Sequence, residues 1–349
     1  MTALLEARDI CVVFGGGIGR VAKRAVNEVS LSVGGHPPKI MALVGESGSG
    51  KTTLTRLLLG FANPTSGTVR YNGTELAAMD AGERNAFRRE VQAIFQDPFD
   101  VYNPFYKVDR VLLKPLRNFK IATSRADAYS RIEQALSTVG LRPRETLGRY
   151  PHQLSGGQRQ RVMIARALLL QPRIILADEP VSMVDASLRA TILESLFRLK
   201  TELGISLVYV THDLTTAYQI SDEVVVLYGG RVVEIGDVES VIRTPHHPYT
   251  RELIDAIPPP DPDQPWGNEK QTVRPVDAPA IAEEGCPFAN RCPHTMPVCR
   301  TQIPTLIRTS PGRRTACHLY DEARANETSG TDRTTAATAS RASFAGVRS

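Results

Sequence analysis

The sequence predicts an α/β fold with a mixed sheet core, a helical subdomain and a small cysteine-rich extension toward its C-terminal end. Short apolar runs at 40–44, 174–177 and 206–210 predict buried strands, and helical stretches separate them. Such alternation is typical of a largely parallel sheet covered by helices. A glycine pair at 229–230, between two further apolar runs, predicts a hairpin.

The character of the 349-residue chain changes along its length. From about 98 to 165 a loop-like stretch gives way to a charged, mostly helical segment, which predicts a helical subdomain inside a first domain of residues 1–257. Consecutive prolines at 258–260 predict an extended spacer that opens a second segment, residues 258–320. Residues 321–349 contain hardly any large apolar side chain and are predicted to be a disordered tail.

Composition places the chain among ordinary globular proteins. It is 42% apolar and 23% charged, and its net charge of +5 permits contact with an anionic surface without requiring one. No apolar run approaches the roughly 18 residues that span a bilayer, and the segment MTALLEARDI does not have the pattern of a signal peptide. We expect a cytosolic protein whose membrane role, if it has one, depends on a partner.

The segment GESGSGKT at 45–52 lies between a predicted strand and apolar residues at helical spacing. Its glycines allow successive backbone N–H groups to point at one anion at the N-terminus of a helix, as in a P-loop NTPase fold. Lys51 is placed to reach the β- and γ-phosphates of ATP, and the Thr52 hydroxyl is placed to bind Mg²⁺. The predicted nucleotide-binding residues of this loop are Gly45, Glu46, Ser47, Gly48, Ser49, Gly50, Lys51, Thr52 and Thr53.

Two adjacent carboxylates, Asp178 and Glu179, end an apolar strand, where they are costly unless they have a function. Asp178 fits an indirect ligand of Mg²⁺, and Glu179 fits the general base that polarises the attacking water. Gln96 follows another apolar run and is placed to contact both Mg²⁺ and that water. His212 follows the strand predicted at 206–210 and could hydrogen-bond the γ-phosphate; Glu179, His212 and Gln96 are therefore the predicted catalytic residues.

Residues 154–158 read LSGGQ and precede a predicted helix. The Ser155 hydroxyl and the N–H groups of the glycines therefore lie at a positive helix end, which suits a phosphate. We expect this pentapeptide to face the γ-phosphate of a nucleotide held by a second subunit. Its predicted nucleotide-binding residues are Ser155, Gly156, Gly157 and Gln158.

With these elements in this order, the chain resembles the ATP-binding subunit of an ABC transporter, and residues 5–255 carry the pattern. The resemblance implies an ABC-type nucleotide-binding domain, a head-to-tail dimer and two ATP molecules at its interface. It implies that Phe14 stacks on adenine, with a core position as the alternative. It also implies that Asp185, in SMVD at 182–185, belongs to a loop through which the two cassettes communicate.

The C-terminal part resembles the oligopeptide/dipeptide importer subfamily, through HPYT at 247–250, GCPF at 285–288 and RCP at 291–293. The resemblance implies an ATPase that powers peptide uptake through two transmembrane permease subunits. It also implies a second ATP-binding subunit that is a different chain, an extracytoplasmic binding protein, and a peripheral place on the cytoplasmic face of the inner membrane. No nucleic-acid partner is expected.

Other interpretations remain open. The segments 101–106 and 181–185 resemble the sugar-importing branch, so oligosaccharides are an alternative substrate. Nickel is another alternative, because related systems import it. A soluble ABC ATPase that acts on DNA or ribosomes is a rival, although such proteins usually carry two cassettes or a long coiled coil. A non-enzymatic ATP sensor would need a damaged site, whereas Lys51, Glu179 and His212 are all present.

Four of the five cysteines are concentrated in the C-terminal extension, separated by five, six and seventeen residues. Structural disulfides are not expected in the cytosol, and zinc sites favour tighter C-x-x-C pairs. Four thiolates can bind zinc or an iron–sulfur cluster. The resemblance implies a [4Fe-4S] cluster, with zinc or reduced thiols as alternatives. The predicted ligands are Cys286, Cys292, Cys299 and Cys317.

Overall fold

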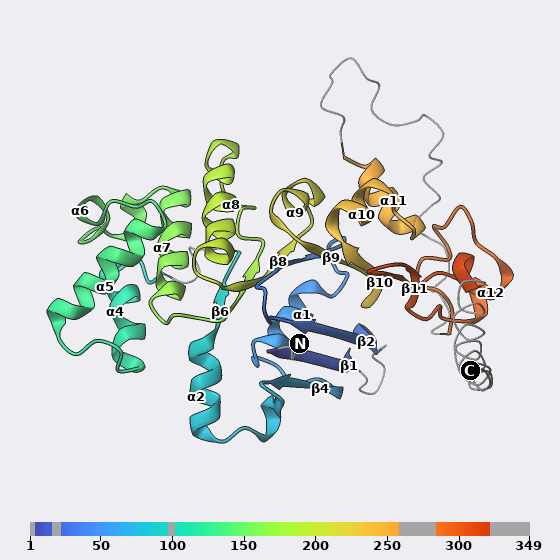
Figure 1. Cartoon of the computed structure of the whole chain (residues 1–349), viewed down its shortest axis with the longest axis horizontal. Helices are drawn as coiled ribbons and strands as arrows, with labels where there is room; N and C mark the ends of the chain where they lie inside the picture. Colours follow the sequence, from blue (N-terminus) through green and yellow to red (C-terminus); the bar gives the residue numbers. More distant parts are fainter. Residues whose placement is uncertain (1–3, 16–21, 97–101, 258–283, 322–349) are drawn as a thin grey trace, which may run out of the picture. The chain divides into compact units, whose positions relative to one another are not determined.

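The computed structural model describes residues 4–15, 22–96, 102–257 and 284–321. The chain forms two compact units, Met1–Val232 and Val233–Ser349, which are described separately (Figure 1). The boundary between these units lies after Val232. The sequence instead predicts a change of domain after residue 257, and those domain bounds stay a prediction. The predicted proline spacer and the predicted tail beyond Asp321 lie outside the described residues.

The core of the first unit is a five-stranded parallel sheet in the order β9-β3-β8-β7-β6. Every residue of β3, β6 and β8 is buried, as expected for strands that are covered on both faces. Parallel pairing brings the carboxyl ends of these strands to one edge of the sheet. The strands are β3 (Ile40–Val44), β6 (Val91–Ile94), β7 (Ile174–Asp178), β8 (Ser206–Thr211) and β9 (Glu223–Tyr228).

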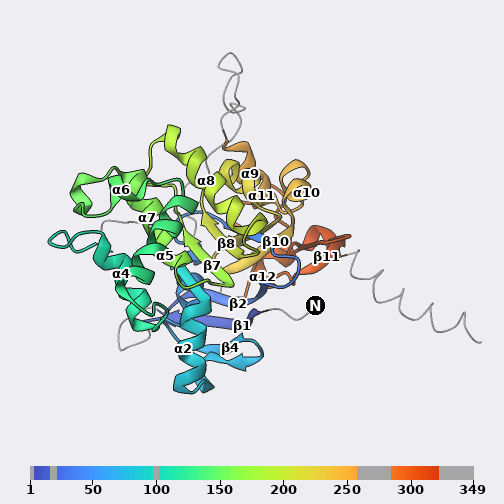
Figure 2. The same ribbon diagram turned by 60° about the vertical axis from the view of Figure 1, so that its left-hand side comes forward.

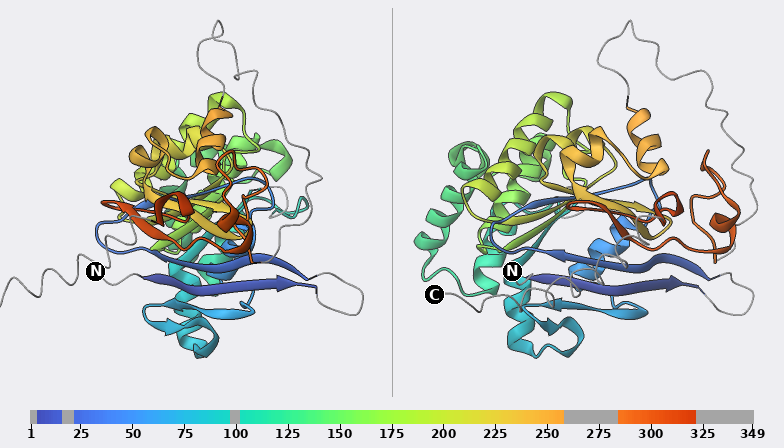
Figure 3. Two further views of the ribbon diagram at one scale, coloured as in Figure 1. Left: turned by 90° about the vertical axis from the view of Figure 1, so that its right-hand side faces the viewer. Right: turned by 45° about the vertical axis from the view of Figure 1, so that its right-hand side comes forward.

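A second, antiparallel sheet in the same unit has the order β2-β1-β4-β5. Buried and exposed residues largely alternate along its strands, as expected for a sheet with one face on the core. Its strands are β1 (Leu5–Phe14), β2 (Lys23–Val33), β4 (Ser66–Tyr71) and β5 (Thr74–Glu75). Figure 3 shows this sheet as a separate layer, with α1 (Lys51–Leu58) between it and the parallel sheet.

Three other helices of the first unit lie between successive strands of the chain. The Asp213 carboxylate accepts the N–H groups of Thr215 and Thr216 and so begins α9. Asp80 and Glu83 form a reciprocal capping box at the start of α2. These helices are α2 (Ala81–Glu90), α8 (Ala186–Thr201) and α9 (Leu214–Ile220), and a 3₁₀ turn, η1 (Leu76–Ala78), precedes α2.

Helices between 109 and 168 form a group of their own, at the position where the sequence predicts a helical subdomain (Figure 2, green). One face of α5 is buried through Ala128, Ile132, Ala135 and Leu136, which recur at helical spacing. The elements are α4 (Asp109–Asn118), α5 (Arg125–Thr138), α6 (Pro143–Thr146), the 3₁₀ turn η2 (Pro151–Gln153) and α7 (Gly156–Leu168).

The second unit has a small antiparallel sheet, β10-β12-β11, together with short helices. Phe288 packs against His247 and Tyr249, with ring centroids 5.8 and 5.5 Å apart. The buried Glu234 carboxylate accepts the backbone N–H groups of His246 and His247, 3.0 Å away in each case. The elements are β10 (Arg231–Asp237), α10 (Val238–Arg243), α11 (Pro248–Asp255), α12 (Pro297–Thr301), β11 (Ile307–Ser310), β12 (Arg313–Thr315) and η3 (His318–Tyr320).

Candidate active site

The phosphate loop connects the buried strand β3 to α1 and closely approaches two neighbouring backbones. A Cβ atom on Gly45 would lie 2.2 Å from the carbonyl oxygen of Leu227, and one on Gly50 would lie 2.3 Å from that of Ala25. Both glycines also have positive φ angles, +152° and +105°. Glycine is therefore required at these positions by space as well as by conformation.

Lys51 lies inside the curve of this loop. Its Nζ donates to the carbonyl oxygens of Gly45 and Glu46, at 2.6 and 2.9 Å, and only 7% of the residue is exposed. Burial lowers the pKa of Lys51, while the negative charges of Glu179 and Asp178 oppose that shift. The Lys51 amine and the carboxylates of Asp178 and Glu179 are therefore close enough for their charges to interact. The sequence predicts this arrangement for a site that binds phosphate and Mg²⁺.

Asp178 ends β7 close to the same loop. Burial raises its pKa, and the neighbouring charge of Glu179 raises it further, while Lys51 acts in the opposite direction. A carboxyl group whose charge is disfavoured in this way gains most from a nearby cation, which would restore its ionised form. Asp178 therefore fits a Mg²⁺ site, for which Thr52, Gln96 and Asp178 are the predicted ligands.

Glu179 occupies the centre of the site. Its Oε2 accepts a hydrogen bond from Gln96 Nε2 at 3.0 Å, and its Oε1 lies 3.0 Å from His212 Nδ1. The Glu179 backbone has a φ of +43°, which is uncommon for a residue other than glycine, and its N–H donates to the Val210 carbonyl. The three predicted catalytic side chains thus meet, although they follow three different strands.

The LSGGQ segment begins α7 with a reciprocal cap. Ser155 Oγ accepts the N–H of Gln158 at 3.2 Å, and Gln158 Oε1 accepts the N–H of Ser155 at 2.9 Å. Gln158 therefore fixes the shape of the loop, while Ser155 remains exposed. Gly157 packs closely on Leu188, where a Cβ atom would approach its Cδ1 to 2.8 Å.

The predicted site residues thus form two groups. The first surrounds Lys51 and contains Asp178, Glu179, Gln96 and His212. The second joins the start of α7 to the start of α8, where Asp185 is the exposed N-terminal flanking residue. Phe14 lies at the end of β1 with 56% of its surface exposed, which leaves its ring available for stacking.

Three polar residues that were not predicted from the sequence also support the site. The N–H and Oγ of Ser182 both donate to the Glu179 carbonyl, at 3.2 and 2.9 Å. Gln160 and Arg166, on α7, donate to the carbonyls of Phe95 and Ala93, at 3.3 and 2.8 Å, and so hold the strand that leads to Gln96. Gln160 is 1% exposed, but nothing in the sequence distinguishes it or Arg166 from the other polar residues of this helix.

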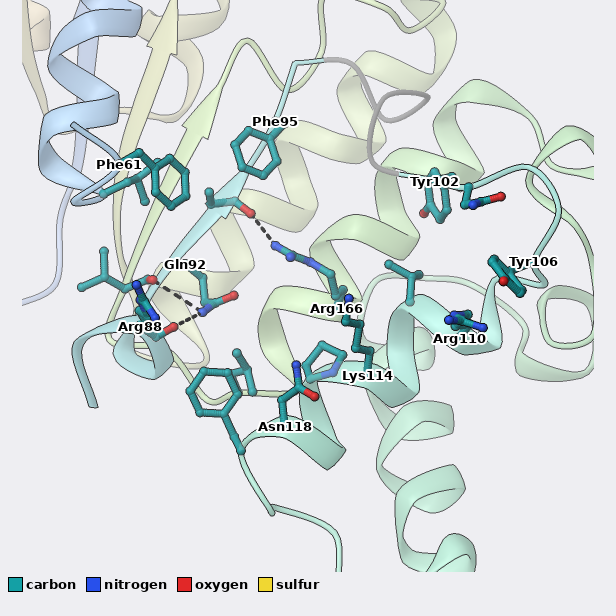
Figure 4. A pocket seen from close by; sticks show the side chains of 18 of the residues that line it. Phe61, Arg88, Gln92, Phe95, Tyr102, Tyr106, Arg110, Lys114, Asn118 and Arg166 are labelled. Atoms are coloured by element: carbon teal, nitrogen blue, oxygen red, sulfur yellow. Dashed lines mark hydrogen bonds between the residues drawn. The ribbon is translucent and has the colours of Figure 1, made fainter. Parts of the chain in front are cut away.

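A cavity of about 590 Å³ opens beside this strand, between the core and the helical group (Figure 4). Six aromatic side chains line it, and Phe61 stacks on Phe95 with ring centroids 6.4 Å apart. Five lysine or arginine residues line it as well, and none of its described lining residues is a carboxylate. Figure 4 shows Arg110, Lys114 and Arg166 pointing toward this space.

The four C-terminal cysteines are close enough that Cys317 is influenced by the charges of the other three. Burial raises the pKa of Cys286 to about 11 and that of Cys317 to about 12, which favours thiols over thiolates. Among the described residues, which include all four, no group of three or more histidine, cysteine or acidic side chains is arranged to hold a metal ion. The structure therefore does not support the predicted iron–sulfur cluster or the zinc alternative.

The phosphate loop, the paired carboxylates and the LSGGQ helix together define an ABC-type ATPase. The family described as ABC transporter matches residues 26–182, and the family described as oligopeptide/dipeptide transporter, C-terminal region, matches residues 233–299. The chain therefore belongs to the ATP-binding subunits of ABC transporters, in their oligopeptide/dipeptide transporter family. The predicted resemblance is confirmed, and the chain is an ATPase that uses ATP and Mg²⁺.

Curated relatives agree with this assignment over most of their length. The chain is 40% identical to the putative oligopeptide transport ATP-binding protein YkfD of Bacillus subtilis over 325 residues, which are 93% of this chain and 98% of that protein. It is 39% identical to the oligopeptide transport ATP-binding protein OppF of Salmonella typhimurium, over 81% of this chain and 84% of that protein.

Solved structures confirm the predicted fold class. The dimeric ATP-binding cassette MJ0796 bound to ADP and Pi has a TM-score of 0.59 and 28% sequence identity, and the match covers 67% of this chain and 98% of that one. No helix in the described part of the chain is both long and apolar enough to cross a membrane.

Proposed function

We propose that this chain hydrolyses ATP to drive the import of peptides through partner permease subunits, from a peripheral position on the cytoplasmic face of the membrane. The observation that carries the proposal is the meeting of Gln96, Glu179 and His212 next to Lys51. The names of YkfD and OppF support oligopeptides as the transported class.

In this proposal Lys51 and Thr52 hold the β- and γ-phosphates, and the loop N–H groups bind their oxygens. Thr52, Gln96 and Asp178 would hold Mg²⁺, which would supply positive charge for the phosphate oxygens. Glu179 Oε accepts a proton from the water that attacks the γ-phosphorus. His212 keeps Glu179 oriented through the 3.0 Å contact of Nδ1 with Oε1, and its other ring nitrogen is proposed to contact the γ-phosphate.

The exposed Ser155, the neighbouring glycines and Asp185 are proposed to face the ATP of a second cassette. The MJ0796 match supports this arrangement, because that cassette is described as dimeric. Since Gly157 packs on Leu188, the LSGGQ segment and the Asp185 loop would approach the second cassette as one surface. The second subunit is proposed to be a different chain, and an extracytoplasmic binding protein is proposed to deliver the peptide.

The aromatic and basic cavity beside β6 is the proposed docking site for a permease segment. Aromatic residues such as Phe61 and Phe95 would accept apolar side chains, and the cations would accept carboxylates. Because Arg166 joins this cavity to the Ala93 carbonyl, occupation of the cavity can move β6, which Gln96 follows by two residues. This connection would couple permease contact to hydrolysis.

The proposed function assigns no step to the four cysteines, because no group among the described residues is arranged to hold a metal ion. Metal analysis and the absorbance near 400 nm of protein purified without oxygen would test this point independently of transport.

Transport by the reconstituted complex tests the proposed substrate class. Vesicles with the permeases, both ATPases and the binding protein should hydrolyse ATP faster when oligopeptides are supplied outside, and should accumulate them. Relatives named for peptide transport support peptides over the oligosaccharide and nickel alternatives. Stimulation by oligosaccharides or nickel in place of peptides would contradict the proposal.

A further inference from the structure

A second large groove, of about 910 Å³, lies on the helical group, along α4 and the start of α5. It adjoins the cavity beside β6, and four residues line both: Tyr106, Lys107, Arg110 and Lys114. Its lining contains six cations and a single carboxylate, Asp109. The cations are Lys107, Arg110, Lys114, Arg117, Lys120 and Arg125.

The charge of this groove is concentrated and unbalanced. Six positive charges and one negative charge give a local net charge of +5, which equals the formal net charge of the entire chain. The Asp109 carboxylate is already engaged, because it accepts the N–H of Gly148 at 2.8 Å and lies 3.4 Å from the Tyr129 hydroxyl. The groove therefore presents an excess of positive charge to its surroundings.

The cations are arranged on one side of α4. Arg110, Lys114 and Arg117 recur at intervals of four and three residues, which places them on one face of the helix. Lys107 lies two residues before the helix begins, and all four cations are exposed. The opposite side of the helix is buried through Leu112 and Leu116. This helix thus has the form of a basic amphipathic surface.

An aromatic pair extends the same surface. Phe105 is 84% exposed and Tyr106 is 43% exposed, and both line the groove. The Arg110 guanidinium stacks on the Tyr106 ring, 3.7 Å from its centroid, which holds charge and ring together. Exposed aromatic rings beside lysine and arginine are typical of surfaces that rest in the headgroup region of a bilayer.

We propose that this groove binds the surface of a membrane rich in anionic phospholipids, with the cations on lipid phosphates and Phe105 among the headgroups. The proposal goes beyond the transport function, because it requires neither the permease nor the transported substrate. Each cation near such a surface strengthens binding by about five-fold. Arg117, Lys120 and Arg125 line this groove and not the cavity beside β6, so they can be changed separately.

The test is sedimentation of the full chain with vesicles of phosphatidylcholine alone or with 30% phosphatidylglycerol. Wild type should bind the anionic vesicles preferentially, and 300 mM NaCl should weaken that binding. The double variant Arg117→Glu/Lys120→Glu should bind about 25-fold more weakly or worse. The matched control Arg142→Glu/Arg144→Glu changes two exposed cations outside the groove and should stay within about two-fold of wild type.

Basal ATP hydrolysis in solution should be the same for both variants, which separates lipid binding from folding. The proposal is overturned if wild type binds both vesicle types equally, or if the groove and control variants lose binding alike. It is also overturned if a soluble glutamate-rich peptide binds in a manner that depends on Arg117 and Lys120 while the anionic vesicles do not, since the groove would then be a peptide site.

Discussion

Gln96 Nε2 donates to Glu179 Oε2 at 3.0 Å, so a residue two positions beyond the end of β6 is held by the residue directly after β7. β6 and β7 are adjacent and parallel, and their carboxyl ends place these side chains together. Gln96 also follows the segment that lines the aromatic cavity. The contact therefore connects the proposed permease site to the proposed general base.

Replacing Gln96 with Ala should uncouple hydrolysis from the permease. Glu179 and His212 would still meet, so basal ATP turnover should fall less than ten-fold, while stimulation by permease and peptide should disappear. The measurement is ATPase activity with and without reconstituted permease. Gln134→Ala is the matched control, since Gln134 is an exposed glutamine of α5 that lines neither the cavity beside β6 nor the groove on α4. Normal stimulation of Gln96→Ala would show that this connection is not used.

Ser155→Arg should abolish turnover of the assembled dimer and leave ATP binding by the isolated subunit nearly unchanged. The reason is that Ser155 is proposed to face the partner's nucleotide. Arginine also removes a helix cap, which costs about 1 kcal/mol. Ser124→Arg removes an equivalent cap from α5 and serves as the control, because Ser124 Oγ accepts the Asp127 N–H. Loss of ATP binding by the isolated Ser155→Arg subunit would argue against the division into two half-sites.

Gly45→Ala should destabilise the protein much more than Gly48→Ala. Both glycines have positive φ, but a Cβ at Gly48 meets nothing within 4 Å, whereas one at Gly45 meets the Leu227 carbonyl at 2.2 Å. We expect a loss of about 1 kcal/mol for Gly48→Ala and of at least about 3 kcal/mol for Gly45→Ala. Urea unfolding monitored by circular dichroism would compare them, and equal losses would contradict the close approach.

His247 should make folding stability fall as the pH falls. Burial lowers its pKa to about 4, from an ordinary value of 6.5, so the unfolded chain takes up this proton first. The contribution of His247 to the free energy of unfolding is therefore fully present above about pH 6.5. It declines by about 3 kcal/mol as the pH falls toward 4.

His247→Asn tests this pH dependence. Asparagine can keep the cap that His247 Nδ1 provides to the Tyr249 N–H, but it does not titrate. Unfolding free energies between pH 7 and 4 should vary less in this variant than in wild type. Glu234, whose pKa burial raises, works in the opposite direction but is present in both proteins. His152→Asn, at an exposed histidine, should retain the wild-type slope; an unchanged slope in His247→Asn would refute the assignment.

Much of the site could be predicted from the sequence because its parts are contiguous. The loop around Lys51 and the pair Asp178–Glu179 are each determined by a strand and the residues directly after it. The meeting of Gln96, Glu179 and His212 depends on the strand order β6-β7-β8, which apolar runs alone do not specify. The positive φ of Glu179 likewise follows from its surroundings and not from its residue type.

Other features could not be predicted because they depend on side-chain packing between distant segments. Gln160 and Arg166 lie within an ordinary helical pattern, and only the position of β6 reveals that they hold its carbonyls. The cysteine spacing indicated a shared site, but spacing does not determine whether thiols are arranged around a metal. Burial of Cys286 and Cys317 favours their protonated forms.

The most direct test of the account is the rate of ATP hydrolysis by Glu179→Gln, measured together with its affinity for ATP. Glutamine preserves the size of the side chain, and its amide oxygen can still accept the Gln96 N–H, but it cannot accept a proton from water. We predict a loss of turnover of at least about 100-fold with ATP affinity within about three-fold of wild type. Turnover close to that of wild type would contradict the assignment of Glu179 as the general base.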